Sequence, residues 1–215
     1  MLELINISLK WNSPKEKPFI KNLSLKINNG NILCVFGKSG VGKSSLINVI
    51  AGTTEDNLSF EGEIILNGKI LNNIPVEKRK IGLLLQDGAL FPHLTVEQNI
   101  YFGMKRKIKS QEKLMIINEN LKKANMEGFQ NRYPHTLSGG QKARIACLRA
   151  VLSEPEVLLL DEPFSSLDPE HRNTFRNFVI SKVKENNIPC LLVTHDKNDK
   201  MISNQKHIDL NMFMK

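Results

Sequence analysis

The sequence has few of the features that staple small secreted proteins or anchor a chain in a bilayer. Its three cysteines, Cys34, Cys147 and Cys190, are far apart, and none has zinc-ligand or CxxC spacing. We therefore expect all three to be buried and reduced, as in a cytosolic protein. The longest apolar runs, such as "ILCVF" and "VLLL", are too short to cross a membrane. Residues 1–10, "MLELINISLK", lack the basic and apolar regions of a signal peptide.

The charge balance is strongly basic but does not identify a partner by itself. The chain has 215 residues, enough for one core or for one core and a smaller lobe, and a formal net charge of +8. Such a balance is compatible with nucleic acid, an anionic membrane surface or an anionic ligand. The basic residues are scattered, apart from a cluster at 104–109, "MKRKIK". We expect that cluster to be a solvated loop or helix face.

Hydrophobic patterning predicts an α/β core with a helical insertion. Strands are expected at 2–9, 23–27, 32–36, 63–71, 81–86, 157–160 and 190–193, with a hairpin turn at Asn67–Gly68. Helices are expected at 43–51, 95–104, 110–125, 140–152 and 169–186, with Pro169 in the first turn of the last one. We expect one domain over 1–215, in which 1–87 and 156–215 form the α/β core and 88–155 form a helical subdomain.

Residues 37–44, "GKSGVGKS", match the pattern G-x-x-x-x-G-K-[ST] between a buried strand and a helix. Backbone N–H groups of such a loop bind phosphates, and its glycines permit the required backbone geometry. Lys43 is expected to contact the outer phosphates, and the Ser44 hydroxyl to bind Mg²⁺. The expected ATP-binding residues are Gly37, Lys38, Ser39, Gly40, Val41, Gly42, Lys43, Ser44 and Ser45.

Two carboxylates follow a strongly apolar strand in "VLLLDEP", residues 157–163. The carboxyl ends of strands are where α/β sheets bind ligands. We expect Asp161 to hold Mg²⁺ through water, and Glu162 to act as the base or the water-orienting group for attack on the γ-phosphate.

The stretch "TLSGGQKARI", residues 136–145, predicts a helix that begins after a serine and two glycines. Ser138 fits the N-cap position, and the glycines leave the helix end bare. An uncovered helix N-terminus binds anions, although these ten residues on their own favour an ordinary capped helix after a glycine turn.

Taken in order, "GKSGVGKS", Gln86, "LSGGQ", "VLLLDEP", "SSLD" and His195 look like the motifs of the ATP-binding cassette family. The resemblance covers nearly the whole chain. It implies a P-loop NTPase of the cassette type, with a mostly parallel sheet core, an antiparallel β subdomain and an inserted helical signature subdomain. It also implies ATP hydrolysis with Mg²⁺, and a head-to-tail homodimer in which Ser138, Gly139, Gly140 and Gln141 of one chain cap the ATP of the other.

Further roles come from the same resemblance, position by position. Gln86 resembles the glutamine that reaches Mg²⁺ and the attacking water, and His195 the switch histidine on the γ-phosphate. Asp168 resembles the aspartate at the dimer interface. Trp11 occupies a place where the family often stacks an aromatic ring on adenine, although a tryptophan that covers the core is the alternative.

Residues 90–100, "LFPHLTVEQNI", are similar to importer cassettes of the thiamine, iron and maltose type, and together with the short length they indicate the thiamine-transporter-like branch. The implied function is the ATPase subunit of a binding-protein-dependent importer at the cytoplasmic face of the membrane. Permease subunits would contact residues 86–110, and a substrate-binding protein would act indirectly. Because twenty residues follow His195, we expect no C-terminal regulatory domain. Two alternatives remain: a soluble cassette ATPase in DNA repair or translation, although no nucleic-acid partner is expected, and a nucleotide-binding regulator without catalysis.

Overall fold

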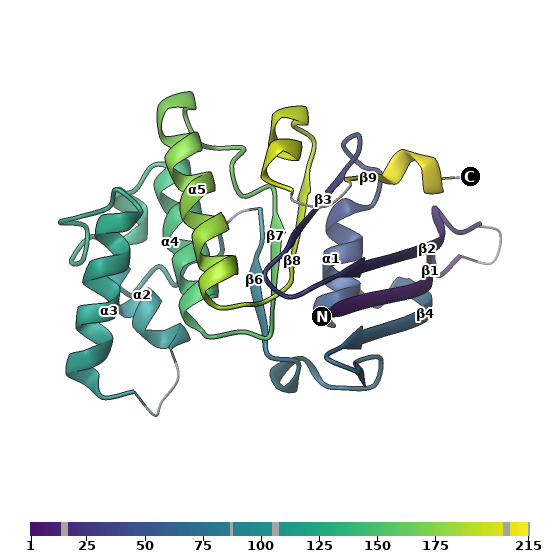
Figure 1. Ribbon diagram of the computed structural model, residues 1–215, viewed down its shortest axis with the longest axis horizontal. Coiled ribbons are helices and arrows are strands. Elements are labelled where there is room, and N and C mark those ends of the chain that lie inside the picture. Colours follow the sequence, from purple (N-terminus) through teal and green to yellow (C-terminus); the bar gives the residue numbers. More distant parts are fainter. Residues whose placement is uncertain (14–16, 87, 105–107, 204–206, 215) are drawn as a thin grey trace.

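The computed structural model confirms the α/β cassette fold expected from the sequence (Figure 1). It describes residues 1–13, 17–86, 88–104, 108–203 and 207–214. Within those residues two sheets and a group of helices form successive layers. The antiparallel sheet lies at one end of the molecule and the α2–α3 helices lie at the other.

The antiparallel sheet has the strand order β2-β1-β4-β5. Its strands are β1 (Leu2–Trp11), β2 (Ile20–Ile27), β4 (Leu58–Leu66) and β5 (Lys69–Ile70). The turn between β4 and β5 contains Asn67 at φ 50° and Gly68 at φ 78°. Positive φ at both central positions is the signature of a type I′ hairpin, which confirms the turn expected from the Asn-Gly pair.

The parallel sheet has the order β6-β7-β8-β3-β9. Its strands are β3 (Ile32–Phe36), β6 (Ile81–Leu84), β7 (Val157–Asp161), β8 (Cys190–Thr194) and β9 (Ile208–Asp209). Alternate residues of one strand enter different cores: Leu159 packs toward the antiparallel sheet, and Leu158 and Leu160 pack toward the opposite face. Burial on both faces explains why these strands are continuous apolar runs in the sequence.

The helices confirm the expected helical segments and cover different faces of the parallel sheet. Helix α1 (Lys43–Ala51) packs between the two sheets. On the other face lie α2 (Val96–Gly103), α3 (Ser110–Lys123), α4 (Gly139–Leu152) and α5 (Pro169–Glu185). Short 3₁₀ turns are η1 (Val76–Lys78), η2 (Pro134–Thr136), η3 (Lys197–Ile202) and η4 (Leu210–Phe213).

The three cysteines are buried and unpaired, as expected. Burial raises the pKa of the Cys34 thiol and of the Cys147 thiol to about 12, so both stay protonated at neutral pH. Among the described residues, no helix combines the length and apolar character needed to cross a bilayer.

Candidate functional site

The topology brings four of the expected motifs to one edge of the parallel sheet. The strands β6, β7, β8 and β3 lie in this order and run parallel. Their carboxyl ends lead into Gln86, into Asp161 and Glu162, into His195, and into the loop at 37–42. Segments from across the chain therefore meet at the edge where α/β folds bind ligands.

The loop at 37–42 presents an open helix end. Gly42 is the N-cap of α1 and has φ 99°, and Gly40 has φ 79°, both in the left-handed region that favours glycine. No side chain caps the first turn of α1, so its N–H groups are available to an anion. The Lys43 ammonium group is buried and donates to the carbonyl oxygens of Gly37 and Lys38, each at 3.1 Å. It thereby closes the loop into a ring.

Asp161 has the environment of a cation ligand. Its side chain is only 3% exposed, and one carboxylate oxygen, Oδ1, is buried without a hydrogen-bond partner among the described residues. The carboxylate also accepts a hydrogen bond from the Ser44 hydroxyl. Burial is the main cause that raises its pKa, and the neighbouring Glu162 charge adds to this effect. An unsatisfied oxygen beside a hydroxyl fits Mg²⁺, which prefers oxygen ligands.

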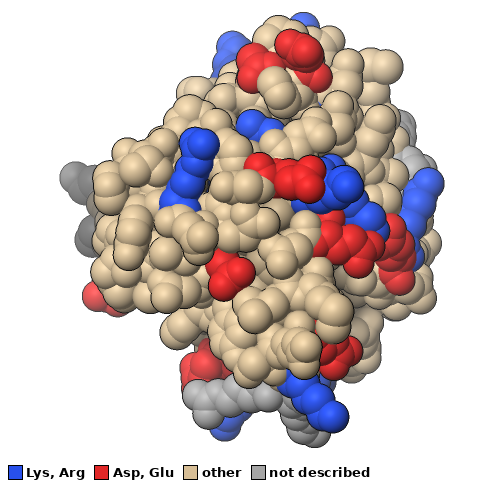
Figure 2. All heavy atoms as spheres, turned by 90° about the vertical axis from the view of Figure 1, so that its left-hand side faces the viewer, with Lys and Arg blue, Asp and Glu red and all other residues tan. Residues whose placement is uncertain are grey.

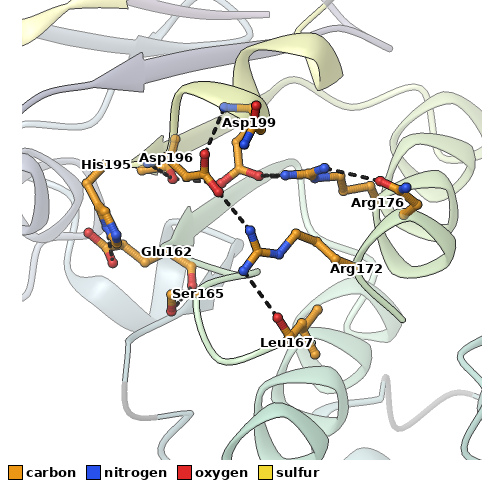
Figure 3. A network of polar contacts seen from close by, with 11 residues as sticks. Glu162, Ser165, Leu167, Arg172, Arg176, His195, Asp196 and Asp199 are labelled. Atoms are coloured by element: carbon orange, nitrogen blue, oxygen red, sulfur yellow. Dashed lines mark hydrogen bonds and ion pairs between the residues drawn. The ribbon is translucent and has the colours of Figure 1, made fainter. Parts of the chain in front are cut away.

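Glu162 and His195 form a direct pair. The Oε2 atom of Glu162 lies 2.8 Å from Nδ1 of His195 (Figure 3). Its Oε1 atom lies 3.7 Å from Nζ of Lys43. Glu162 has φ 48°, an uncommon conformation for a residue other than glycine. Its backbone N–H donates to Val193 and its C=O accepts from Ser165, which hold this conformation in place. Such strain is often found at functional sites.

Gln86 and Asp168 lie at the surface. Gln86 is exposed just beyond β6, whose Leu84 pairs with Leu160 of β7, so it leaves the sheet next to Asp161. Asp168 is the N-cap of α5 and accepts from the backbone N–H of His171 at 3.0 Å. This hydrogen bond is the main cause that lowers the pKa of Asp168.

Trp11 borders the same loop. A hollow of about 310 Å³ is lined by Trp11, Phe19, Gly40, Gly42, Lys43, Ser44 and Ser45. Trp11 is 37% exposed, and its ring stacks on Phe19 with centroids 5.3 Å apart. Phe19 in turn lies against Gly42, where a Cβ atom would be 2.6 Å from its ring. Sequence reasoning missed Phe19, because its contact with Trp11 depends on β1 and β2 being neighbours.

The segment at 138–141 forms a capped helix end on the other face of the sheet. Ser138 caps α4 and forms a reciprocal pair with Gln141: each side chain accepts from the other residue's backbone N–H. Ser138 and Gly139 are exposed, whereas Gly140 is buried. A Cβ atom at Gly140 would be 2.6 Å from the carbonyl oxygen of Ser166. The expectation of a wholly bare helix end is therefore wrong at Gly140, whose lack of a side chain allows close packing.

A second hollow, of about 300 Å³, lies between the edge strand β6 and the helices α2 and α4. Phe102 on its rim is 67% exposed and packs edge-on against Phe91, with centroids 4.8 Å apart. The Arg149 guanidinium lies 5.3 Å from the Phe91 ring. The buried Asn99 side chain accepts from the Phe91 N–H at 2.8 Å and donates to the Phe91 carbonyl. Sequence reasoning placed a contact region here but did not identify these residues.

Comparison with known proteins gives a consistent result for most of the chain. The model of the ABC transporter family matches residues 20–165. The chain is 39% identical over 199 residues to an uncharacterized ABC transporter ATP-binding protein, YnjD, of Escherichia coli K12, covering 93% of this chain and 90% of that protein.

Longer relatives and solved structures agree with this match. The chain is 40% identical to the sulfate/thiosulfate import ATP-binding protein CysA of Synechocystis over 85% of its length, and 37% identical to the putrescine transport ATP-binding protein PotG of Escherichia coli K12 over 94%. It spans about half the length of these two relatives (51% and 52%). A dimeric cassette, MJ0796, bound to ADP and Pi superposes with a TM-score of 0.83 at 27% identity, covering 98% of this chain and 95% of that one.

Proposed function

The chain belongs to the ABC transporter family, and on this premise we propose that it is the ATP-hydrolysing subunit of a membrane importer, powered by ATP-driven closure of a cassette dimer. Relatives named as import proteins, such as CysA for sulfate and thiosulfate and FbpC of Fusobacterium nucleatum for Fe(3+) ions, support the importer assignment.

The observation that carries the proposal is the convergence of three side chains from three separate segments of the chain. Glu162 lies 2.8 Å from His195 and 3.7 Å from Lys43. A carboxylate held between a phosphate-binding lysine and an imidazole is suited to orient water for attack on a bound phosphoryl group.

Each residue then has a role that follows from its position. Backbone N–H groups of residues 37–45 and the Lys43 ammonium bind the phosphates, and Glu162 accepts the proton of the attacking water. His195 orients Glu162 and would form a hydrogen bond with the γ-phosphate. Gln86 reaches the same edge of the sheet from the end of β6. Asp161 and Ser44 would hold Mg²⁺, which neutralises charge on the phosphate oxygens when bound.

The arrangement of the two phosphate-binding helix ends supports a site shared between subunits. Helix α1 packs on one face of the parallel sheet and α4 on the other. No hydrogen bond recorded for the described residues joins 138–141 to 37–45. Ser138, Gly139, Gly140 and Gln141 would therefore cap ATP bound to a second copy, with Asp168 at the interface. The dimeric state of MJ0796 supports this assignment.

The hollow around Phe91 and Phe102 is the proposed contact for the permease subunits. Its exposed aromatic ring next to a hollow is typical of a docking surface. Four of its lining residues, Ala89, Phe91, Phe102 and Gly103, belong to the expected contact region, 86–110, in which residue 87 and residues 105–107 lie outside the described residues. A chain bound there would work at the cytoplasmic face of the membrane, with a substrate-binding protein acting through the permease.

A mixed dimer tests the shared site. One subunit carries Lys43→Ala and the other carries Ser138→Arg, with different purification tags. In the shared-site arrangement both lesions fall in one composite site, so the other site keeps an intact Lys43 and an intact Ser138. Each homodimer has a lesion in both sites. We expect the mixed dimer to retain a labelled ATP analogue at one site, and both homodimers to retain none.

The experiment measures retention of nucleotide and not ATP turnover, because a dimer that needs both sites for hydrolysis would show no turnover with one intact site. If each chain completed its own site, every subunit of the mixed dimer would be defective. A mixed dimer without retained nucleotide, beside a wild-type dimer that retains it, would exclude the shared site.

The alternative of a nucleic-acid-binding cassette is not favoured. On the face shown in Figure 2, lysine and arginine side chains alternate with aspartate and glutamate, and wide areas carry neither. Nucleic-acid binding uses continuous basic surfaces instead. Residues 105–107 of the basic cluster at 104–109 lie outside the described residues.

A further inference from the structure

Arg172, in the first turns of α5, contacts two loops of the nucleotide site at once. Its Nη2 atom donates to the carbonyl oxygen of Leu167 at 3.1 Å, and its Nη1 atom pairs with Oδ2 of Asp196 at 2.7 Å (Figure 3). Leu167 directly precedes Asp168, and Asp196 directly follows His195. One guanidinium group therefore joins the segment 165–168 to residues 195–199, the loop after β8, called the histidine loop below.

The histidine loop is held on both sides of His195. Oδ1 of Asp196 accepts from the backbone N–H of Asn198 at 2.8 Å, and the N–H of Asp196 donates to Oγ1 of Thr194 at 3.0 Å. The imidazole of His195 itself is 53% exposed, and its recorded partner is Glu162. The imidazole therefore reaches Glu162 from a backbone that the hydrogen bonds of its neighbours, Thr194 and Asp196, hold in place.

Arg176, one turn further along α5, holds the same loop, and its guanidinium lies 5.6 Å from the ring of Phe164 instead of bonding to the backbone of 165–168. Its guanidinium pairs with Oδ1 of Asp199, and Oδ2 of Asp199 accepts from the Thr194 hydroxyl at 2.7 Å. Its Nη1 atom donates a hydrogen bond to Oδ1 of Asn173 in the same helix. Arg176 is thus a matched control, with the same residue type, helix face and target loop.

The segment 165–168 is also in contact with the helix end at 138–141. The carbonyl oxygen of Ser166 approaches Gly140 so closely that a Cβ atom there would be 2.6 Å away. A Cβ atom at Gly140 would also be 3.0 Å from the Leu167 side chain. A continuous series of contacts therefore runs from Gly140 through Leu167 and Arg172 to the pair of His195 and Glu162.

We propose that Arg172 is a positioning residue that couples the segment 165–168 to His195, so that the pairing of His195 with Glu162 depends on the placement of that segment. The consequence of this coupling rests on the proposed function, in which the segment 165–168 and Gly140 face the second subunit. Docking of the partner would then be transmitted to the hydrolytic pair within one chain. A guanidinium presents several donors in a fixed plane, and a lysine cannot hold both contacts in this way.

The first test needs no ATP hydrolysis. NMR spectra of the nucleotide-free chain are compared for wild type, Arg172→Gln and Arg176→Gln at one fixed pH. We expect Arg172→Gln to shift both the ring signals of His195 and the backbone amide signals of 166–168. Arg176→Gln is expected to shift the histidine loop alone. If Arg172→Gln folds poorly, Arg172→Lys replaces it and is expected to shift the same two sets.

The second test separates positioning from folding by kinetics. In the dimeric or transporter-bound protein, we expect Arg172→Gln to lower kcat for ATP about tenfold, with KM changed less than about twofold, because a small misplacement of reacting groups costs up to about 10²-fold in rate. Asp196→Asn is expected to give a similar loss, and the double variant no greater loss than the more severe single one. Arg176→Gln is expected to lower thermal stability more and kcat less.

The outcomes separate this inference from the proposed function. A wild-type protein without hydrolysis would overturn the proposed function, while the NMR comparison would still decide the coupling. Unchanged His195 signals or unchanged 166–168 signals in Arg172→Gln would overturn the inference, as would equal losses of kcat in Arg172→Gln and Arg176→Gln.

Discussion

Nδ1 of His195 lies 2.8 Å from Oε2 of Glu162, although 32 residues separate them in the chain. The two side chains meet because β7 and β8 are parallel neighbours, with Asp161 opposite Val193. A carboxylate in this position has an orienting partner on one side and the Lys43 ammonium on the other.

Glu162→Gln removes the proposed base without changing the size of the side chain. We expect this variant to bind Mg·ATP, to hydrolyse it about 10²–10⁴-fold more slowly, the usual contribution of general base catalysis, and to accumulate as an ATP-bound dimer. Phosphate release and size-exclusion chromatography with ATP measure both effects. Glu156→Gln is the control, since that carboxylate pairs with Lys80 outside the site. Near-normal hydrolysis by Glu162→Gln would remove Glu162 from the role of base.

Asp161→Asn is expected to stabilise the nucleotide-free chain at neutral pH while it abolishes Mg²⁺-dependent hydrolysis. Burial raises the pKa of Asp161 above 3.8, so the folded chain binds this proton more tightly than the unfolded chain. Its contribution to the free energy of unfolding therefore falls as the pH rises from 3.8 through the raised pKa, and it stays lower above that interval.

Because asparagine carries no charge, the gain should be about 0.5–2 kcal/mol at neutral pH and should shrink as the pH approaches 3.8. Chemical denaturation at a series of pH values measures it. Adding Mg·ATP at about 100 times its Kd should stabilise the wild type by about 2.7 kcal/mol and the variant by much less. A variant less stable than wild type at pH 7 would contradict the unfavourable burial of this charge.

Trp11→Ala is expected to weaken nucleotide binding, and Trp11→Tyr to preserve most of it. Trp11 lies on the rim of the hollow that contains Lys43, and its ring is partly exposed. Loss of one stacked ring costs about 1–3 kcal/mol in related base-stacking sites. Titration with a fluorescent ATP analogue gives the three affinities. Equal affinities would assign Trp11 to packing against Phe19 alone.

Phe102→Asp is expected to abolish co-purification with the permease subunits while leaving ATP affinity unchanged. A buried aromatic anchor at an interface contributes about 2 kcal/mol or more, and a carboxylate in its place would be buried without a partner. Met115→Asp is the matched control, because Met115 is 62% exposed on α3 and does not line the hollow. Pull-down from membranes with tagged variants measures the effect. Equal recovery of permease by the two variants would exclude the hollow as the docking site.

Local chemistry explains what was predictable from the sequence. The strands at 32–36 and 157–161 are short apolar runs, and Ser138 caps helix α4, as the start of the helix indicated. These features depend on residues within a few positions of each other, so the sequence alone determined the element types, the phosphate-binding loop and the α/β fold.

The tertiary structure decided every relationship that crosses between strands. The stacking of Trp11 on Phe19, the pairing of Glu162 with His195 and the two contacts of Arg172 all join segments whose proximity depends on strand order. The burial of Asp161 Oδ1, which has no hydrogen-bond partner among the described residues, also depends on the tertiary structure, because the residues that bury it lie far away in the chain. Side-chain contacts of this type are set by the packing of whole sheets and helices, and no local pattern of residues encodes them.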